Sequence, residues 1–364
     1  MKIIVFAKEN LSLTGGNIYD SLIFNSLKQD LNFNIEFYEP RIHKSGFAIN
    51  KLITPFIELK WLKKIKHSDA VFWNSVDAYH CLLLIFFVNF FLPNKKTFVL
   101  HHHYKFMEMN GIKKIFFKFF EINFLKMASS IIIPSPYILY ETKKYLPSNN
   151  LTYLEIGFDE NKIDKKKQIN KGHMLFVGNI EHRKGLHLLV ESLNILKEDN
   201  NNFFVNVIGS IIEKDYFDNL TEIIKKYGLE NNIIFHGRVS NEEKNIYFQN
   251  SDFFIFPSLL EGYGMVIIEA MSYGLPVVAF NNSAMPYTIK NGYNGLLATN
   301  EDIHDLMRKM SNVLSDENLR EILSNGALET FSKCRKLNIL KDEIKLFVKT
   351  IRNHKNINTK KASL

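Results

Sequence analysis

The chain has 364 residues, of which 46% are hydrophobic and 23% charged, a composition typical of a soluble enzyme with room for two domains. Its only cysteines, Cys81 and Cys334, exclude a disulfide framework and a Cys-x-x-Cys metal or redox site. The net charge of +8 is unevenly distributed. Residues 1–168 contain 23 basic and 15 acidic side chains, whereas residues 169–364 contain 23 of each.

A basic first half favours an anionic partner, such as a membrane surface, a phosphorylated acceptor or nucleic acid. The alternative is codon bias, since Lys, Asn, Ile and Phe are abundant along the chain. The first ten residues, "MKIIVFAKEN", resemble a strand rather than a signal peptide, so we expect a cytoplasmic protein. The apolar run "CLLLIFFVNFF" at 81–91 is about half of what spanning a bilayer requires and predicts a buried helix.

Short apolar runs alternate with helical stretches along the whole chain, a pattern that predicts βαβ units and parallel sheets. In the first half the expected strands are 2–7, 70–74, 97–101 and 129–135. In the second half they are 173–179, 202–210, 232–239, 252–258 and 276–280. The sequence therefore predicts an α/β protein with two sheets.

The stretch 159–173, "DENKIDKKKQINKGH", has too few large apolar side chains to contribute to a core, so we place the domain boundary near residue 168. The first domain is then 1–168 and the second 169–332. A carboxy-terminal helix is expected at about 333–352, followed by a disordered tail, 353–364.

The stretch "LEGYGMVIIEAMSYGLPVVAF" at 260–280 predicts a glycine turn, a short buried helix from Met265 to Met271, a left-handed stop at Gly274 and a further strand. The start of a helix that follows a glycine turn at the carboxyl end of a parallel strand is well suited to binding phosphate. Glu261 and Glu269, with seven residues between them, would then lie on either side of a nucleotide. The alternative is that Glu261 is a surface residue of the loop and Glu269 a salt-bridge partner at the end of the helix.

The segment "EGYGMVIIEAMSYGLPVV" resembles the Glu, seven residues, Glu signature of the retaining glycosyltransferases of family 4. "LFVGNIEHRKGLHLLVESL" at 175–193 resembles the same family's diphosphate-binding block. Two weaker matches are "LTGGN" at 13–17, a glycine loop, and "TFVLHHHY", a strand ending in a functional histidine that falls on His101.

The resemblance implies a GT-B fold, in which two Rossmann-like domains face a central cleft and the carboxy-terminal helix crosses back to the first domain. It implies that the first domain binds the acceptor and the second the nucleotide-sugar donor. The implied catalytic residues are Glu261, His101 and Lys184. The implied donor-binding residues are Gly15, Gly16, Arg183, Lys184, Gly262, Tyr263, Gly264 and Glu269.

Two positions depart from the family pattern. Asn179 stands where the family usually has Arg, so the basic pair must be Arg183 and Lys184, or Lys184 alone. Tyr287 replaces a usual Glu, so sugar contacts made there in relatives are not transferred.

The sequence contains no Asp-x-Asp pair, and of the neighbouring histidines 101–103 at most two converge in a strand, so we expect no metal and no cofactor. The helix expected at 111–127 is apolar nearly all round, which favours a core position, although its lysines also suit a membrane surface.

We therefore expect a metal-independent hexosyltransferase that uses a UDP- or GDP-linked sugar. The expected acceptor is a glycan or a lipid-linked sugar of bacterial surface polysaccharide synthesis, with no nucleic acid partner and a peripheral place at the inner face of the membrane. The alternatives are a nucleotide-sugar epimerase of the same fold and a non-catalytic anion-binding protein. A dinucleotide oxidoreductase is excluded because no Gly-x-Gly-x-x-Gly turn follows the first strand.

Overall fold

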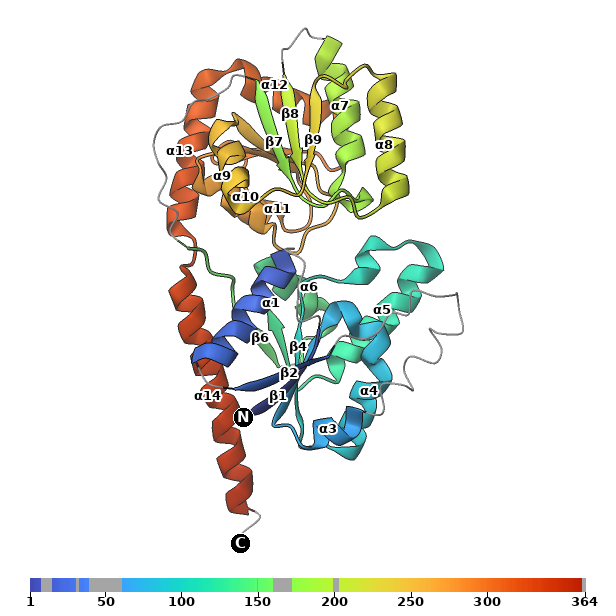
Figure 1. Cartoon of the computed structure of the whole chain (residues 1–364), viewed down its shortest axis with the longest axis vertical. Helices are drawn as coiled ribbons and strands as arrows, with labels where there is room; N and C mark the ends of the chain where they lie inside the picture. The colour runs from blue at the N-terminus through green and yellow to red at the C-terminus, as the bar shows by residue number, and fades with distance from the viewer. Residues whose placement is uncertain are drawn as a thin grey trace. The chain divides into compact units, whose positions relative to one another are not determined.

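A computed structural model describes residues 1–7, 15–30, 33–38, 61–148, 150–159, 172–198 and 203–361 (Figure 1). The chain forms two compact units, one comprising Met1–Asp159 with Arg335–Leu364 and the other Glu160–Cys334. The expected boundary near residue 168 lies outside the described residues.

The first unit contains a parallel sheet in the order β2-β1-β3-β4-β5-β6. The four strands expected from the sequence are its four central strands, β1, β3, β4 and β5. The two edge strands, β2 and β6, were not expected, because an edge strand needs less apolar surface than a central one. The strands are β1 (Lys2–Phe6), β2 (Asn34–Tyr38), β3 (Ala70–Asn74), β4 (Lys96–Leu100), β5 (Ser130–Ile133) and β6 (Leu151–Tyr153).

Helices cover both faces of this sheet, as Figure 1 shows, and bury its central strands. The run at 81–91 lies in α4, where Leu84, Ile85 and Val88 are buried but Phe86 and Phe90 are exposed, so the expected burial is only partly correct. The helices are α1 (Gly15–Asn25), η1 (Ser26–Asp30), α3 (Leu62–Lys66), η3 (Ser75–Asp77), α4 (Ala78–Phe91), η4 (Lys105–Glu108), α5 (Gly111–Lys126), α6 (Pro136–Tyr145) and α14 (Leu337–Lys361).

The second unit repeats the architecture with a parallel sheet in the order β12-β11-β10-β7-β8-β9. All five strands expected here are present, and the unexpected β12 is again at an edge. Its strands are β7 (His173–Val177), β8 (Phe204–Ile208), β9 (Ile233–Gly237), β10 (Phe253–Phe256), β11 (Val277–Phe280) and β12 (Gly295–Ala298). Its helices are η5 (His182–Lys184), α7 (Leu186–Glu198), α8 (Lys214–Lys226), α9 (Asn241–Asn250), α10 (Met265–Ser272), α11 (Met285–Thr288), α12 (Ile303–Ser315) and α13 (Glu317–Lys333).

The carboxy-terminal helix α14 belongs to the first unit, which confirms the expected return crossing. Its Phe347 packs edge-to-face on Phe98 of β4, with ring centroids 5.3 Å apart. The helix continues to Lys361, well into the stretch 353–364 that was expected to be disordered. No Gly or Pro interrupts that stretch, so an established helix can propagate through it. Among the helices of the described ranges, none combines the length and apolarity needed to cross a bilayer.

Candidate active site

The glycine turn of the second unit connects β10 to α10. Gly264 precedes the helix with φ of 79°, a left-handed conformation that favours glycine, and no side chain caps the first turn of α10. Gly262 and Tyr263 form the bend between Glu261 and this helix start. The uncapped N–H groups at the start of α10 can therefore receive an anion, as the sequence predicts.

The basic pair lies on the loop after β7, in the short helix η5. Gly185 follows with φ of 69°, and a Cβ at this position would lie 2.0 Å from the carbonyl oxygen of Pro257. Only glycine therefore lets this loop approach the loop after β10. The two loops are also joined by the Leu259 N–H, which donates to the carbonyl of Arg183 at 2.9 Å.

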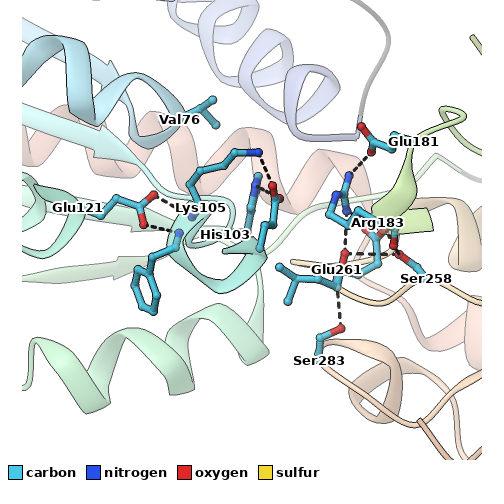
Figure 2. A network of polar contacts seen from close by, with 12 residues as sticks. Val76, His103, Lys105, Glu121, Glu181, Arg183, Ser258, Glu261 and Ser283 are labelled. Carbon is cyan, nitrogen blue, oxygen red and sulfur yellow. Dashed lines mark hydrogen bonds and ion pairs between the residues drawn. The ribbon is translucent and has the colours of Figure 1, made fainter. Parts of the chain in front are cut away.

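Glu261 accepts hydrogen bonds from both Arg183 and Lys184. Figure 2 shows its contacts with Arg183 and Ser258. Lys184 Nζ and Arg183 Nη1 both donate to its Oε1, the latter at 3.2 Å. Ser258 Oγ donates to the same oxygen at 2.9 Å. Arg183 Nη2 donates to Glu181 at 2.6 Å, so two carboxylates neutralise the two cations.

Burial and charge act in opposite directions on Glu261. Burial favours the neutral carboxyl, but the charges of Lys184 and Arg183 and the hydrogen bonds from Lys184 and Ser258 outweigh it and lower the pKa of Glu261 to about 2. Burial lowers the pKa of Lys184, and the charge of Glu261 partly offsets that effect. Glu261 is therefore ionised throughout the neutral range.

The backbone of Glu261 is held from a third loop, the one after β11. The Glu261 N–H donates to Ser283 Oγ at 3.0 Å, and Ser283 in turn donates to Asn282 Oδ1 at 2.8 Å. Ser283 has φ of 43°, which is uncommon outside glycine and is a feature often found at functional sites. Sequence reasoning missed this serine and Ser258, because nothing in the order of residues shows that three separate loops meet at Glu261.

The second carboxylate of the signature, Glu269, lies on α10 and forms an ion pair with Lys244 of α9. Their side chains are 32% and 21% exposed, so the pair is accessible from solvent. Lys244 was also missed, since it lies in a polar helix with no motif around it. The structure thus places Glu269 with a cation of its own, apart from the contacts of Glu261.

His101 follows β4 in the first unit and is completely buried. Its ring centroid lies 4.3 Å from that of Tyr104, and in the described part of the chain neither ring nitrogen has a hydrogen-bond partner. Burial lowers the pKa of His101 well below its ordinary value, and the neighbouring His103 and His102 lower it further. The residue stays neutral.

The imidazole that lies beside Gly16 is that of His102. A Cβ on Gly16 would lie 3.4 Å from its ring, and Gly15 begins the helix α1 that carries both glycines. His102 Nε2 lies 2.7 Å from Asp20 Oδ1, and Asn74 donates to the other oxygen of Asp20 at 2.7 Å. Because neighbouring residues of an extended chain point in opposite directions, His101 enters the core while His102 faces α1.

The residues after His102 form a second polar cluster at the same edge of the sheet (Figure 2). His103 Nε2 lies 3.2 Å from Glu108, which also pairs with Lys105. Glu121 of α5 accepts the N–H groups of Lys105 at 2.8 Å and Phe106 at 3.0 Å. Within the described ranges, no three His, Cys, Asp or Glu side chains are grouped so as to hold a metal ion.

Two units with doubly covered parallel sheets have the GT-B fold. Residues 158–330 match the sequence model of the family described as glycosyl transferases group 1, and this region of the chain belongs to that family. The match spans most of the second unit and slightly less than half of the chain.

Three comparisons show the range of its relatives. A 41.2 kDa protein from the cps region of Klebsiella pneumoniae is 28% identical over 73% of this chain and 75% of its own length. The Staphylococcus aureus capsular polysaccharide biosynthesis glycosyltransferase CapM is 28% identical over 49% of this chain, which spans only 47% of CapM. The crystal structure of Anabaena HepE with UDP and glucose covers 96% of this chain and 100% of HepE, with a TM-score of 0.73 at 18% identity.

Proposed function

We propose that this protein is a retaining hexosyltransferase that moves a sugar from a UDP- or GDP-linked donor to a glycan or lipid-linked acceptor in bacterial surface polysaccharide synthesis. Relatives named for a cps region and for capsular polysaccharide biosynthesis support the pathway. HepE, crystallised with UDP and glucose, supports a nucleotide-sugar donor.

One observation carries the proposal: Arg183 and Lys184 converge on Glu261 beside the uncapped start of α10. A nucleotide-sugar donor loses a nucleoside diphosphate, so negative charge develops on the bridging oxygen as the bond to the sugar breaks. Two fixed cations and the N–H groups after Gly262 would stabilise that charge. We assign these groups to the donor diphosphate.

The two carboxylates take different roles in this proposal. Glu261 is ionised at neutral pH, so it would stabilise positive charge at the anomeric carbon instead of donating a proton. Glu269 is more exposed and would accept hydrogen bonds from the ribose hydroxyls. Tyr263 and Gly264 would bring the backbone close to the phosphates.

The family resemblance implies that Gly15, Gly16 and His101 of the first unit contribute to sugar and acceptor binding. We propose this role for Gly15 and Gly16, because the ring of His101 is completely buried in the core and cannot contact a substrate. The position of His102 against Gly16 makes it a further candidate for this role. Asp20 Oδ1 contacts Nε2 of His102, so Nδ1 of His102 is the ring nitrogen that could form a hydrogen bond with a hydroxyl of the substrate. Replacing His102 by Gln would test this role.

We propose that no metal is required, since Arg183 and Lys184 supply the positive charge that a divalent cation would otherwise provide. Activity should then survive treatment with EDTA. Complete loss of activity in EDTA, restored by a divalent cation, would refute this part of the proposal.

The proposal is tested with the purified full-length chain and a panel of nucleoside diphosphates. A matching nucleotide at 100 times its Kd should raise apparent stability by about 2.7 kcal/mol, visible as a thermal shift. The matching donor and a bacterial lipid-linked acceptor should then give a product whose anomeric configuration, read by NMR, equals that of the donor. An epimerised donor in the absence of acceptor, or binding of nucleotide without any transfer, would favour the epimerase or the non-catalytic alternative.

A further inference from the structure

Helix α5 exposes an apolar stripe on the side away from the core. The buried residues of the helix, Glu121, Phe124 and Leu125, lie in its second half. Its first turns expose four large apolar side chains spaced i, i+3, i+4 and i+7, so that they share one face about 10 Å long. They are Ile112 (86% exposed), Ile115 (71%), Phe116 (45%) and Phe119 (63%).

The charges beside this stripe have one sign. Lys113, Lys114 and Lys118 are exposed on the same turns. At about 100° per residue Lys113 and Lys118 lie on the two flanks of the stripe, whereas Lys114 lies on the opposite side of the helix. The only acidic residue of the helix is Glu121, which is buried and whose oxygens accept the N–H groups of Lys105 and Phe106. Unlike the lysines of ordinary surface helices, those of α5 thus have no acidic neighbour on their own helix.

The helix is firmly attached to the first unit, so the stripe is a fixed surface. Asn89 of α4 donates to the carbonyl of Met127 at 2.7 Å, directly after the end of α5. Lys118 Nζ lies 4.6 Å from the ring centroid of Tyr145 on α6. Glu121 joins the helix to η4 through two backbone hydrogen bonds.

We infer that this face, the α5 stripe with Lys113 and Lys118 on its two flanks, docks on an anionic lipid bilayer. Apolar side chains can enter the boundary between headgroups and acyl chains while neighbouring lysines meet anionic headgroups. A second copy of the chain fits less well, because symmetric pairing through this face would set lysines against lysines. The inference rests on the proposed function in one respect, that a lipid-linked acceptor gives such docking a purpose.

The experiment measures binding of the full-length protein to vesicles of phosphatidylcholine with and without 30% phosphatidylglycerol. We expect binding that requires the anionic lipid and weakens in 0.5 M NaCl. The double variant Ile115→Glu/Phe119→Glu should bind at least about tenfold more weakly, and Lys113→Gln about fivefold more weakly. Ile322→Glu, at a 57% exposed isoleucine on α13 of the second unit, is the matched control and should bind like the wild type.

Circular dichroism and nucleotide binding of each variant separate lost docking from lost folding. Equal vesicle binding by the wild type and Ile115→Glu/Phe119→Glu would overturn the inference. The inference would also be overturned if the wild-type protein did not bind vesicles and instead dimerised through this face or bound RNA. Vesicle binding without nucleotide binding would instead refute the proposed function and leave the docking surface standing.

Discussion

Replacing Lys184 by Ala removes the cation closest to Glu261 and tests the candidate site most directly. The carboxylate would keep Arg183 Nη1 at 3.2 Å and Ser258 Oγ at 2.9 Å. Removing one partner of a buried ion pair typically destabilises a protein by about 3 to 5 kcal/mol. Since Arg183 remains, we expect the lower end, about 3 kcal/mol. The pKa of Glu261 should rise, because burial would then be opposed by a single cation.

The effect on catalysis should be larger than the effect on folding. If Lys184 stabilises the departing diphosphate, its loss should lower turnover roughly 100- to 1000-fold, the typical cost of one preorganised donor. Urea unfolding measures the stability and initial rates with saturating donor measure the turnover. Lys333→Ala is the matched control, because Lys333 pairs with Glu329 on the exposed surface of α13 and should leave both quantities unchanged.

The reasoning would be refuted if Lys184→Ala kept turnover within about threefold of the wild type. It would also be refuted if the variant unfolded at the same urea concentration as Lys333→Ala, since the lysine would then not be part of a buried pair. A variant that is folded at the assay temperature and inactive agrees with the proposal.

Three further predictions follow from single positions. Glu269→Gln should weaken nucleoside diphosphate binding about tenfold in calorimetry, with no such loss for a 2′,3′-dideoxy nucleotide. Burial raises the pKa of Glu121 to about 7, so the folded protein favours the protonated carboxyl. The contribution of Glu121 to the free energy of unfolding is therefore complete below pH 4.5 and is lost, by about 3 kcal/mol, as pH rises through 7. Glu121→Gln should flatten the dependence of the free energy of unfolding on pH, measured by urea unfolding between pH 5 and 8. Gly185→Ala should lower the Tm much more than Gly292→Ala, because both glycines have positive φ but only the first would bring a Cβ to 2.0 Å from a carbonyl oxygen.

The central strands of both sheets were predictable because they are buried on both faces and therefore appear as continuous apolar runs. β10, "FFIF", and β11, "VVAF", are completely buried. The edge strands lack this signal: β2 is "NIEFY", in which Glu36 pairs with Lys2 and Lys64 at the surface. Such a strand is defined by its partner in the sheet, which the local sequence does not show.

The candidate site was predictable where its residues are adjacent to glycines with a defined geometry. Gly264 and Gly274 have the left-handed conformations that the pattern around α10 requires. The partners of the charged residues were not predictable, since Ser258, Ser283 and Lys244 come from other loops and helices. The direction of each histidine after β4 depends on where that strand ends, at Leu100, one residue earlier than the sequence indicates.

The ion pairs of the second unit suggest how a diphosphate would be received. Arg183 is held by Glu181, Glu261 and the carbonyl of Leu260, so its guanidinium is in place before a donor arrives. Little side-chain freedom would then be lost on binding, which favours affinity and a preorganised transition state. Glu261 therefore has two separable tasks, orienting the cations and opposing positive charge on the sugar. Glu261→Gln, which keeps an oxygen acceptor but removes the charge, should lower turnover more than it lowers affinity for the free nucleoside diphosphate.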